Sequence, residues 1–327
     1  MTPLISLEDL SVAFQGVPVL RGVALTLQKG EALGLVGESG SGKSVTWLAA
    51  LGLLPRHAKI SGSVRLDGRE ILGAPPSELD HIRGGRVAMI FQDPASSLNP
   101  VLTIRKQLCE TLALHRDLSG DAVKAEARRL LDLVGIPDAA RRLSAYPHEF
   151  SGGQVQRIMI AMALAGNPDL LIADEPTTAL DATIQAQILE LLSTIRREMG
   201  MAMVLISHDL GVVAENCDRV AVMYAGRIVE EAPSNQIFAD PLHPYAQGLI
   251  GALPPLDGPR RRLTAIPGTV PDPASMPDGC AFAPRCTLAA EPCGLAAPRL
   301  VPIANDRAVA CIRAEASRRA LLGIAAE

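Results

Sequence analysis

The sequence predicts an α/β fold with two additions, and three features of its 327 residues support this. Over residues 1–235, short apolar and β-branched runs alternate with helical patterns, as is typical of α/β proteins. Residues 94–165 read as mostly helical and interrupt this alternation. Residues 236–327 are rich in proline, which indicates a loop-rich C-terminal extension that needs some additional staple to hold it together.

The expected elements can be placed in chain order. Residues 31–37 read as a strand that ends at glycine, and residues 43–54 as a helix closed by Pro55. Asp67-Gly68 provides the turn of an expected hairpin over residues 61–71. Further buried strands are expected at 86–93, 169–175 and 201–209, and an amphipathic helix at 184–195 that stops at Gly200.

The composition restricts which residues can build the core, which partners the protein can attract and where we expect it in the cell. Hydrophobic residues make up 48% of the chain but aromatic ones only 3%, so Leu, Ile, Val and Ala must build the core. The net charge of −4 provides no field that would recruit nucleic acid. There is no signal-peptide pattern and no run of about 18 uncharged apolar residues, so we expect a cytoplasmic protein that does not span a bilayer.

The segment GESGSGKS fills every fixed position of a phosphate-binding loop between an expected strand and an expected helix. The loop consists of Gly37, Glu38, Ser39, Gly40, Ser41, Gly42, Lys43 and Ser44. Its backbone N–H groups and the helix N-terminus would surround a phosphate. Lys43 would reach the β- and γ-phosphates, and the Ser44 hydroxyl would bind Mg²⁺. The segment therefore predicts a nucleotide site.

Three other expected strands end in polar side chains. Asp174 and Glu175 follow the strand in LLIADE, where Asp174 is placed to hold Mg²⁺ and Glu175 to deprotonate an attacking water. Gln92 and His208 end two further strands. Position alone leaves each of these two open, either as a residue of the phosphate site or as an ordinary surface or core side chain.

A second glycine-bearing turn opens onto a helix in YPHEFSGGQVQRIMI, residues 146–160. Such a turn also suits an anion, because free N–H groups point out of a helix N-terminus. One ATP site does not need two such turns, so the second turn requires another explanation.

The order of these motifs resembles the ATPase subunits of ABC transporters, over residues 1 to about 235. The resemblance implies a P-loop NTPase core with an antiparallel β subdomain and an inserted helical subdomain. It also implies ATP hydrolysis with Mg²⁺, roles for Gln92 and His208 at the γ-phosphate and the metal, and stacking of Phe14 on adenine. The motifs that match are the phosphate loop, the Q-loop at Gln92, the signature Ser151-Gly152-Gly153-Gln154, the acidic strand at Asp174-Glu175, the D-loop Ala179-Leu180-Asp181 and the switch His208.

The resemblance also explains the second glycine turn. In this family two ATPase domains pair head to tail, and each signature turn completes the site of its partner. Ser151 and the N–H groups of Gly152 and Gly153 would then contact a γ-phosphate held by a second ATPase subunit, identical or homologous. Asp181 would couple the two sites.

Three segments are similar to the oligopeptide and dipeptide importer ATPases, a group that also includes nickel and glutathione importers. They are IFQDPASSLNPVLTI after Gln92, HPYAQGLI at residues 243–250 and CAFAPRC at residues 280–286. The resemblance implies two transmembrane permeases, an extracytoplasmic solute-binding protein, and a peripheral position on the cytoplasmic face of the plasma (inner) membrane. The helical insert and the segment after Gln92 would grip a permease helix.

A soluble ABC protein and an exporter ATPase are the two alternatives to an importer subunit. Soluble ABC proteins of DNA repair or translation usually carry long coiled-coil insertions or two ATPase domains, and this sequence has neither. Exporter ATPases lack the HPY segment, and many are fused to membrane spans. Both alternatives are therefore disfavoured.

Four cysteines, Cys280, Cys286, Cys293 and Cys311, fall within 32 residues of the extension. Their spacing matches no standard zinc ribbon and leaves free thiols as open as a metal site. Four thiols in a loop-rich segment would suit a metal staple. Some relatives of the peptide-importer group are thought to bind a [4Fe–4S] cluster, so the resemblance adds this cluster to zinc and free thiols as the alternatives.

Overall fold

The computed structural model describes residues 2–93, 97–178, 180–252, 265–303 and 306–321. The chain divides into two units. The first unit comprises Met1–Leu27, Ala32–Leu72 and Ser207–Glu327, and the second comprises Gln28–Glu31 and Gly73–Ile206. Both contain strands and helices, which confirms the predicted α/β class.

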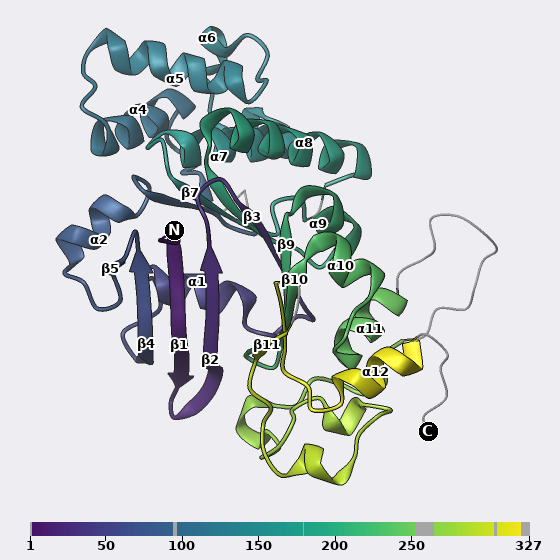
Figure 1. The fold of residues 1–327 in the computed structure, drawn as a ribbon. Helices are drawn as coiled ribbons and strands as arrows, with labels where there is room; N and C mark the ends of the chain where they lie inside the picture. The colour runs from purple at the N-terminus through teal and green to yellow at the C-terminus, as the bar shows by residue number, and fades with distance from the viewer. Residues whose placement is uncertain (1, 94–96, 179, 253–264, 304–305, 322–327) are drawn as a thin grey trace. The chain divides into compact units, whose positions relative to one another are not determined.

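An antiparallel sheet forms the N-terminal part of the first unit. Its strands are β1 (Ile5–Phe14), β2 (Val17–Leu27), β4 (Ala58–Leu66) and β5 (Arg69–Glu70), in the order β2-β1-β4-β5. Figure 1 shows β1, β2 and β4 side by side. Asp67 and Gly68 join β4 to β5 with φ values of 49° and 79°, so the predicted hairpin turn is confirmed, with the positive φ that a tight two-residue turn requires.

A second set of strands in the first unit runs in the order β11-β12-β10-β9-β3. They are β3 (Ala32–Val36), β9 (Arg219–Tyr224), β10 (Arg227–Pro233), β11 (Val301–Ile303) and β12 (Arg307–Val309). Strand β3 pairs parallel with β9 and is buried along its whole length. An apolar strand of this kind is expected where both faces of a sheet are covered.

Helix α1 (Lys43–Ala50) follows β3 and is shorter than the sequence predicted. Gly52, with φ 62°, ends it before Pro55 is reached, and Leu53 N–H bonds Leu48 O. This left-handed glycine is a common helix stop. The other helices of the described part of this unit are α9 (Leu210–Asn216), α10 (Ser234–Ala239), α11 (Pro244–Gly251), α12 (Ala314–Leu321), and the single turns Pro273–Ser275, Ala283–Arg285 and Glu291–Gly294.

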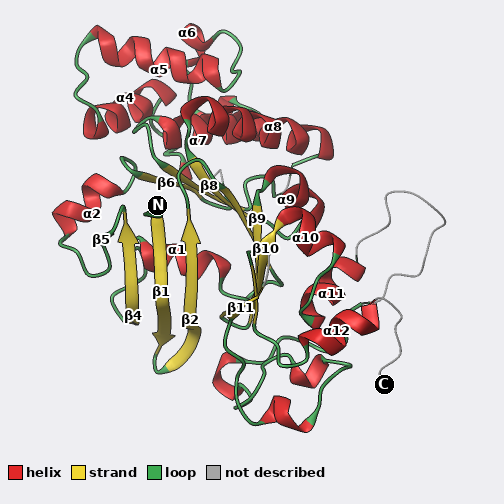
Figure 2. Ribbon diagram, in the orientation of Figure 1, coloured by secondary structure: helices red, strands yellow, loops and turns green. Residues whose placement is uncertain are grey.

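The second unit contains a parallel set of strands in the order β8-β7-β6. They are β6 (Val87–Ile90), β7 (Leu170–Asp174) and β8 (Ala202–Ile206), which lie inside the three predicted strand regions. The helices of the described residues are α2 (Pro76–Ile82), α4 (Ile104–His115), α5 (Asp121–Leu133), α6 (Ala139–Arg142), α7 (Gly152–Leu164) and α8 (Ala182–Met199), with the single turn Pro147–Glu149. Helices α4, α5 and α7 contact one another (Figure 2), so the predicted helical character of this region is confirmed.

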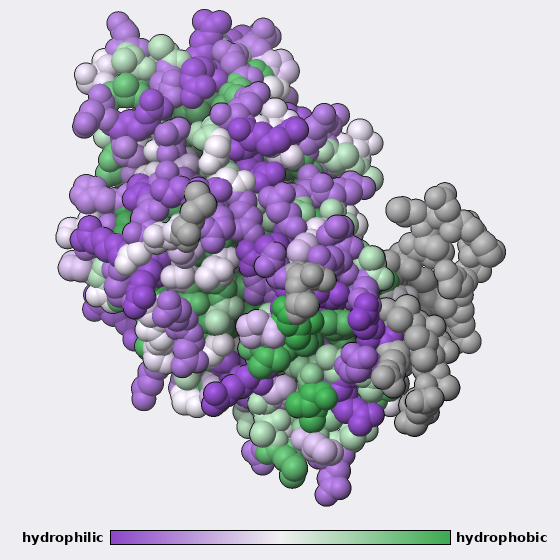
Figure 3. Space-filling model, viewed as in Figure 1, coloured by the Kyte–Doolittle hydropathy of each residue, from purple (hydrophilic) through white to green (hydrophobic). Residues whose placement is uncertain are grey.

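The C-terminal extension shows apolar side chains at its surface. Figure 3 shows them gathered over β11 and the loop-rich segment near it. Leu295, Val301, Ile303 and Ile312 are all exposed, with 75% of Leu295 accessible. In the described part of the chain, none of the helices has both the length and the apolar character needed to cross a membrane.

Candidate ATPase site

The phosphate loop connects β3 to α1 in the first unit. Gly37 and Gly42 have φ values of 153° and 105°, and a Cβ on Gly37 would collide with the carbonyl oxygen of Met223. Only glycine fits there. The loop folds around Lys43, whose Nζ donates hydrogen bonds to Gly37 O (2.8 Å) and Glu38 O (3.0 Å). A phosphate that enters the loop would therefore meet a cation and the N-terminus of α1 together.

The acidic pair lies at the end of β7 in the second unit. Asp174 is the last residue of the strand and only 6% of it is exposed. Glu175 follows with φ 47°, an unusual backbone conformation for a residue other than glycine. Its N–H donates to Ile206 O (2.9 Å), which fixes this conformation against β8. Non-glycine residues with such φ values are enriched at functional sites.

Gln92 and Glu175 are in contact in the structure. Nothing in the sequence indicated this contact. Gln92 Nε2 donates to Glu175 Oε2 at 3.1 Å. Thr178 Oγ1 donates to the same oxygen at 2.9 Å. Two donors therefore orient one oxygen of the Glu175 carboxylate. The contribution of Thr178 was missed, because the neighbouring residues give it no distinguishing pattern.

The signature turn forms the N-terminus of α7. Ser151 is the N-cap, and its Oγ accepts a hydrogen bond from Gln154 N (3.4 Å), while Gln154 Oε1 accepts one from Ser151 N (3.2 Å). This reciprocal pair is a capping box. The hydroxyl proton of Ser151 can still be donated to an anion. Ser151 and Gly152 are exposed, so the turn is open to a ligand from outside the chain.

The remaining predicted residues lie at or beside the ends of strands and helices. Asp181 caps α8 by accepting from Ile184 N (3.0 Å), and it is exposed. His208 is exposed just before α9 in the first unit. Phe14 ends β1, and its ring lies 6.0 Å from the ring of His57, a neighbour that the sequence did not indicate. Ala179 and residues 94–96 lie outside the described residues.

The four cysteines of the extension are the candidate ligands of a metal ion or a [4Fe–4S] cluster. Cys280 N donates to Cys293 O at 2.8 Å, so these two cysteines are neighbours in the structure. Burial and the other three thiols raise the pKa of Cys311 to about 11. Nevertheless, no three His, Cys, Asp or Glu side chains among the described residues are placed to hold a metal ion. The structure therefore does not support the [4Fe–4S] cluster or the zinc alternative.

Two side chains of the extension reach the phosphate loop, within the first unit. Glu38 N donates to Tyr245 Oη at 2.8 Å, and Arg285 Nη1 lies 3.0 Å from Glu38 Oε1 and 3.2 Å from Oε2. Tyr245 and Arg285 belong to the HPYAQGLI and CAFAPRC segments, which the sequence identified only by resemblance. Their contact with the loop was missed because it joins residues more than two hundred positions apart.

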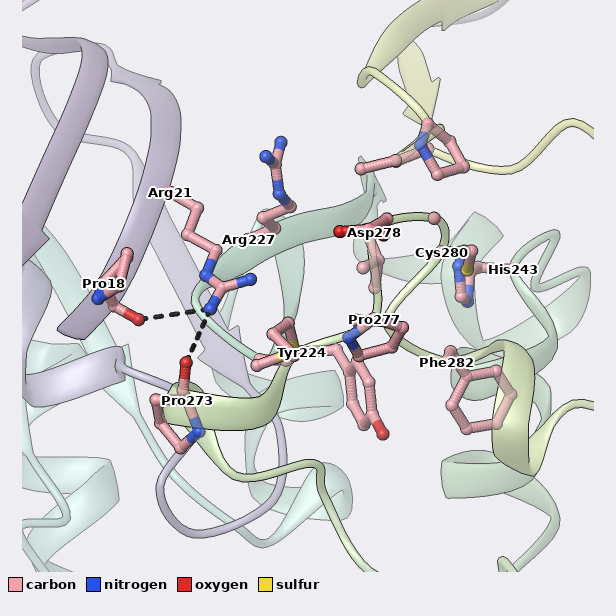
Figure 4. A pocket seen from close by; sticks show the side chains of 18 of the residues that line it. Pro18, Arg21, Tyr224, Arg227, His243, Pro273, Pro277, Asp278, Cys280 and Phe282 are labelled. Atoms are coloured by element: carbon pink, nitrogen blue, oxygen red, sulfur yellow. Dashed lines mark hydrogen bonds between the residues drawn. The ribbon is translucent and has the colours of Figure 1, made fainter. Parts of the chain in front are cut away.

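The extension also lines a cavity of about 410 Å³ in the first unit. Figure 4 shows Arg21 beside it, donating to Pro18 O (3.4 Å) and to Pro273 O (3.1 Å) of the extension. Tyr224 and Phe282 line the same cavity. A second cavity, of about 390 Å³, lies in the second unit between the residues after Gln92 and the signature turn, and includes Leu98, Pro147 and Phe150.

Comparisons with known proteins agree with this geometry. A family model described as "ABC transporter" matches residues 20–178, and one described as "Oligopeptide/dipeptide transporter, C-terminal region" matches residues 229–293. A Brucella melitensis protein whose name refers to peptide import and ATP binding is 52% identical over 314 residues, covering 94% of both chains. The oligopeptide transport ATP-binding protein OppD of Haemophilus influenzae is 49% identical over 304 residues, covering 92% of this chain and 94% of its own.

Solved structures show the same fold. The cbiO1 protein of Clostridium perfringens, part of the cbiONQ ABC transporter complex, superposes with a TM-score of 0.64 at 27% identity, over 73% of this chain and 92% of its own. The ATP-binding cassette MJ0796, solved as a post-hydrolysis dimer with ADP and Pi, gives a TM-score of 0.63 at 29% identity, over 70% of this chain and 98% of its own.

Proposed function

This chain belongs to the ATP-hydrolysing subunits of ABC importers, and we propose that its phosphate loop binds the ATP that drives the uptake of peptides. Lys43 and the loop N–H groups bind the β- and γ-phosphates, and Phe14 stacks on adenine. Ser44, Gln92 and Asp174 are the oxygen donors for Mg²⁺, which prefers such ligands and neutralises developing phosphate charge when bound. The burial of Lys43 within its own loop supports this assignment.

Glu175 is the proposed general base of the hydrolysis. The carboxylate accepts the proton of the attacking water, and Gln92 and Thr178 hold it in position through the contacts at 3.1 and 2.9 Å. These two hydrogen bonds to one oxygen are the observation on which the assignment depends most. His208 is proposed to bond the γ-phosphate. No step of the proposed cycle uses the four cysteines.

A second ATPase subunit completes the site. Ser151, Gly152, Gly153 and Gln154 bind the γ-phosphate held by that subunit, and Asp181 links the two sites. The exposed N-terminus of α7 supports this proposal, because its N–H groups are open to an anion from outside the chain. Hydrolysis would then separate the two subunits and reset the transporter.

The transport role requires membrane partners. We propose two permeases, an extracytoplasmic solute-binding protein that delivers peptides to them, and a location on the cytoplasmic face of the inner membrane. The apolar cavity beside Leu98 and Phe150 is proposed to grip a permease helix. Nickel, glutathione or another small solute is the alternative cargo, and nucleic acid is not a proposed partner. Residues 1–235 form the proposed ATPase domain, with a helical subdomain at 94–165, and residues 236–327 form the extension.

Replacement of Glu175 by Gln tests the proposal. The variant keeps the shape of the side chain and removes the base, so we expect ATP turnover to fall by about 10²–10⁴-fold while ATP binding persists. Turnover is measured by phosphate release from the purified chain, and binding by calorimetry. With ATP and Mg²⁺, the variant should also elute as a dimer in gel filtration.

Glu198→Gln is the matched control, because Glu198 is exposed near the end of α8. It should hydrolyse ATP at the normal rate. Normal turnover in Glu175→Gln would show that another group is the base.

A further inference from the structure

We infer that Tyr245 and Arg285 are positioning residues of the ATP site, through which the C-terminal extension sets the affinity of the phosphate loop for ATP. This inference rests on the proposed function of the loop. Both side chains act on Glu38, the second residue of the loop, and neither belongs to the loop itself.

Arg285 neutralises a carboxylate that would otherwise oppose ATP. Glu38 is part of the loop that receives the triphosphate, and like charges in a partly desolvated site repel strongly. Arg285 Nη1 contacts both carboxylate oxygens, at 3.0 and 3.2 Å. Only 5% of the arginine side chain is exposed, against 30% of the glutamate side chain. Because the guanidinium is buried, solvent and salt screen its attraction to Glu38 only weakly.

The arginine is held in place by the extension and by aromatic rings. Its Nε donates to Pro267 O (2.8 Å), and its Nη1 also lies 3.3 Å from Tyr224 Oη. The guanidinium carbon is 5.8 Å from the ring centres of both Tyr224 and Phe282. Contacts with three residues thus fix the orientation of the guanidinium before ATP arrives, which is what a positioning residue requires.

Tyr245 fixes the backbone of the same loop residue. Its hydroxyl accepts the Glu38 N–H at 2.8 Å, and burial raises the pKa of the phenol, so the group stays neutral. The ring is fully buried and lies 4.6 Å from the Tyr224 ring and 5.4 Å from the Phe282 ring. Aromatic residues are only 3% of the chain, and three of them pack together beside the phosphate loop.

The position of Tyr245 depends in turn on the start of α11. His243 Nδ1 accepts from Tyr245 N (3.0 Å), and the buried carboxylate of Glu230 accepts from His243 N (2.7 Å). Glu230 also pairs with Arg307 of β12 (3.2 Å). A continuous set of contacts therefore runs from β12 of the extension through α11 to the loop, and a shift of the extension would change how Glu38 is held.

The test compares Arg285→Met and Tyr245→Phe with the wild-type full-length protein. Isothermal calorimetry gives the Kd for ATP, and phosphate release gives KM and kcat. We expect Arg285→Met to raise Kd and KM about tenfold, since it removes a hydrogen-bonded ion pair, while kcat at saturating ATP changes little. Tyr245→Phe should raise both by about threefold to tenfold, because one N–H loses its acceptor. Arg299→Met, at an exposed residue of the same extension, should match the wild type.

The double variant Glu38→Gln/Arg285→Met separates electrostatic positioning from a merely structural role. If Arg285 acts by neutralising Glu38, removal of both charges should restore most of the ATP affinity that the single variant loses. An equal loss in the single and double variants would overturn the inference, as would an unchanged Kd in Arg285→Met. Arg285→Lys keeps the charge, so it should retain most of the affinity if Arg285→Met fails to fold.

The variant Lys43→Ala distinguishes failure of this inference from failure of the proposed function. Lys43→Ala should abolish ATP binding if the loop is the ATP site. If wild type and Lys43→Ala bind ATP equally, the proposed function fails and the inference fails with it. If Lys43→Ala loses ATP and Arg285→Met does not, only the inference is wrong.

Discussion

The turnover rate should depend on a single hydroxyl group beside the proposed base. Thr178→Val keeps the shape of the side chain but removes the donor to Glu175 Oε2. Hydrogen bonds to charged groups contribute about 1.5–3 kcal/mol, so we expect kcat to fall roughly tenfold or more. The Kd for ATP should change little, because the hydroxyl that is removed bonds the Glu175 carboxylate, the proposed base. Stopped-flow phosphate release and calorimetry measure the two quantities separately.

Thr177→Val is the neighbouring control, and we expect it to keep most of the turnover. An equal loss of kcat in both variants would mean that the turn as a whole was disturbed, and that the Thr178 hydroxyl has no specific role. A loss of ATP affinity in Thr178→Val alone would also contradict the prediction.

Candidate site residues can be proposed from the sequence where the expected chemistry lies within a short stretch of the chain. Lys43 and Asp174 follow directly from the loop pattern and from the acidic end of an apolar strand. The hydrogen bonds of Glu175 were not predictable, because they depend on its φ of 47° and on a glutamine 83 positions earlier. Such a backbone conformation is imposed by tertiary contacts, which no local pattern reports.

At the scale of elements, the start of α11 explains the HPY sequence. Pro244 occupies the first helical position, where its missing N–H is no loss. His243 serves as the N-cap, and its Nδ1 accepts the Tyr245 N–H while the residue is only 1% exposed. The sequence identified this segment by resemblance but not as a helix cap, since histidine is not among the preferred N-cap residues.

Acid should destabilise the protein through this cap. Burial lowers the pKa of His243 to about 3, against about 6.5 in the unfolded chain. Between these values the unfolded state binds one more proton, so stability is complete above about pH 6.5 and falls as the pH falls toward 3. The expected loss from pH 7 to pH 5 is about 2 kcal/mol. Urea unfolding at several pH values measures it.

His243→Asn provides the comparison, because asparagine can cap a helix and does not titrate. Both proteins carry Glu230, whose pKa burial raises, so its opposing effect cancels in the difference. The variant should lose about 2 kcal/mol less than the wild type over the same pH range. Parallel pH profiles for the two proteins would contradict a role for His243.

For the molecule as a whole, the sequence predicted that the loop-rich extension needs a staple, with a metal held by the four cysteines as one alternative beside free thiols. The cysteines lie close together in sequence, which made them the visible candidates. The structure instead joins the extension to the rest of the first unit through arginines: Arg21 to Pro273 O, Arg285 to Glu38 and Arg307 to Glu230. These partners lie between 77 and 252 positions apart, so no spacing rule could have found them.

The contact between Arg307 and Glu230 should therefore contribute most to the stability of the extension. Glu230 is fully buried, and only 9% of the arginine side chain is exposed. Arg307→Met leaves a buried carboxylate without its cation, a change that typically costs about 3–5 kcal/mol. We expect a marked fall in the urea midpoint, and earlier proteolysis after residue 240, followed by gel electrophoresis and mass spectrometry.

Arg318→Met separates this effect from simple loss of charge. Arg318 and Arg307 both pair with Asp240, at 3.1 and 3.2 Å, but 51% of the Arg318 side chain is exposed. An exposed pair contributes only about 0–1 kcal/mol, so this variant should unfold almost as the wild type does. Glu230→Gln/Arg307→Met should recover part of the stability, because no unpaired buried charge remains. If the two arginine variants were equally unstable, burial of Glu230 would not be the cause, and the extension would be held mainly by its apolar contacts.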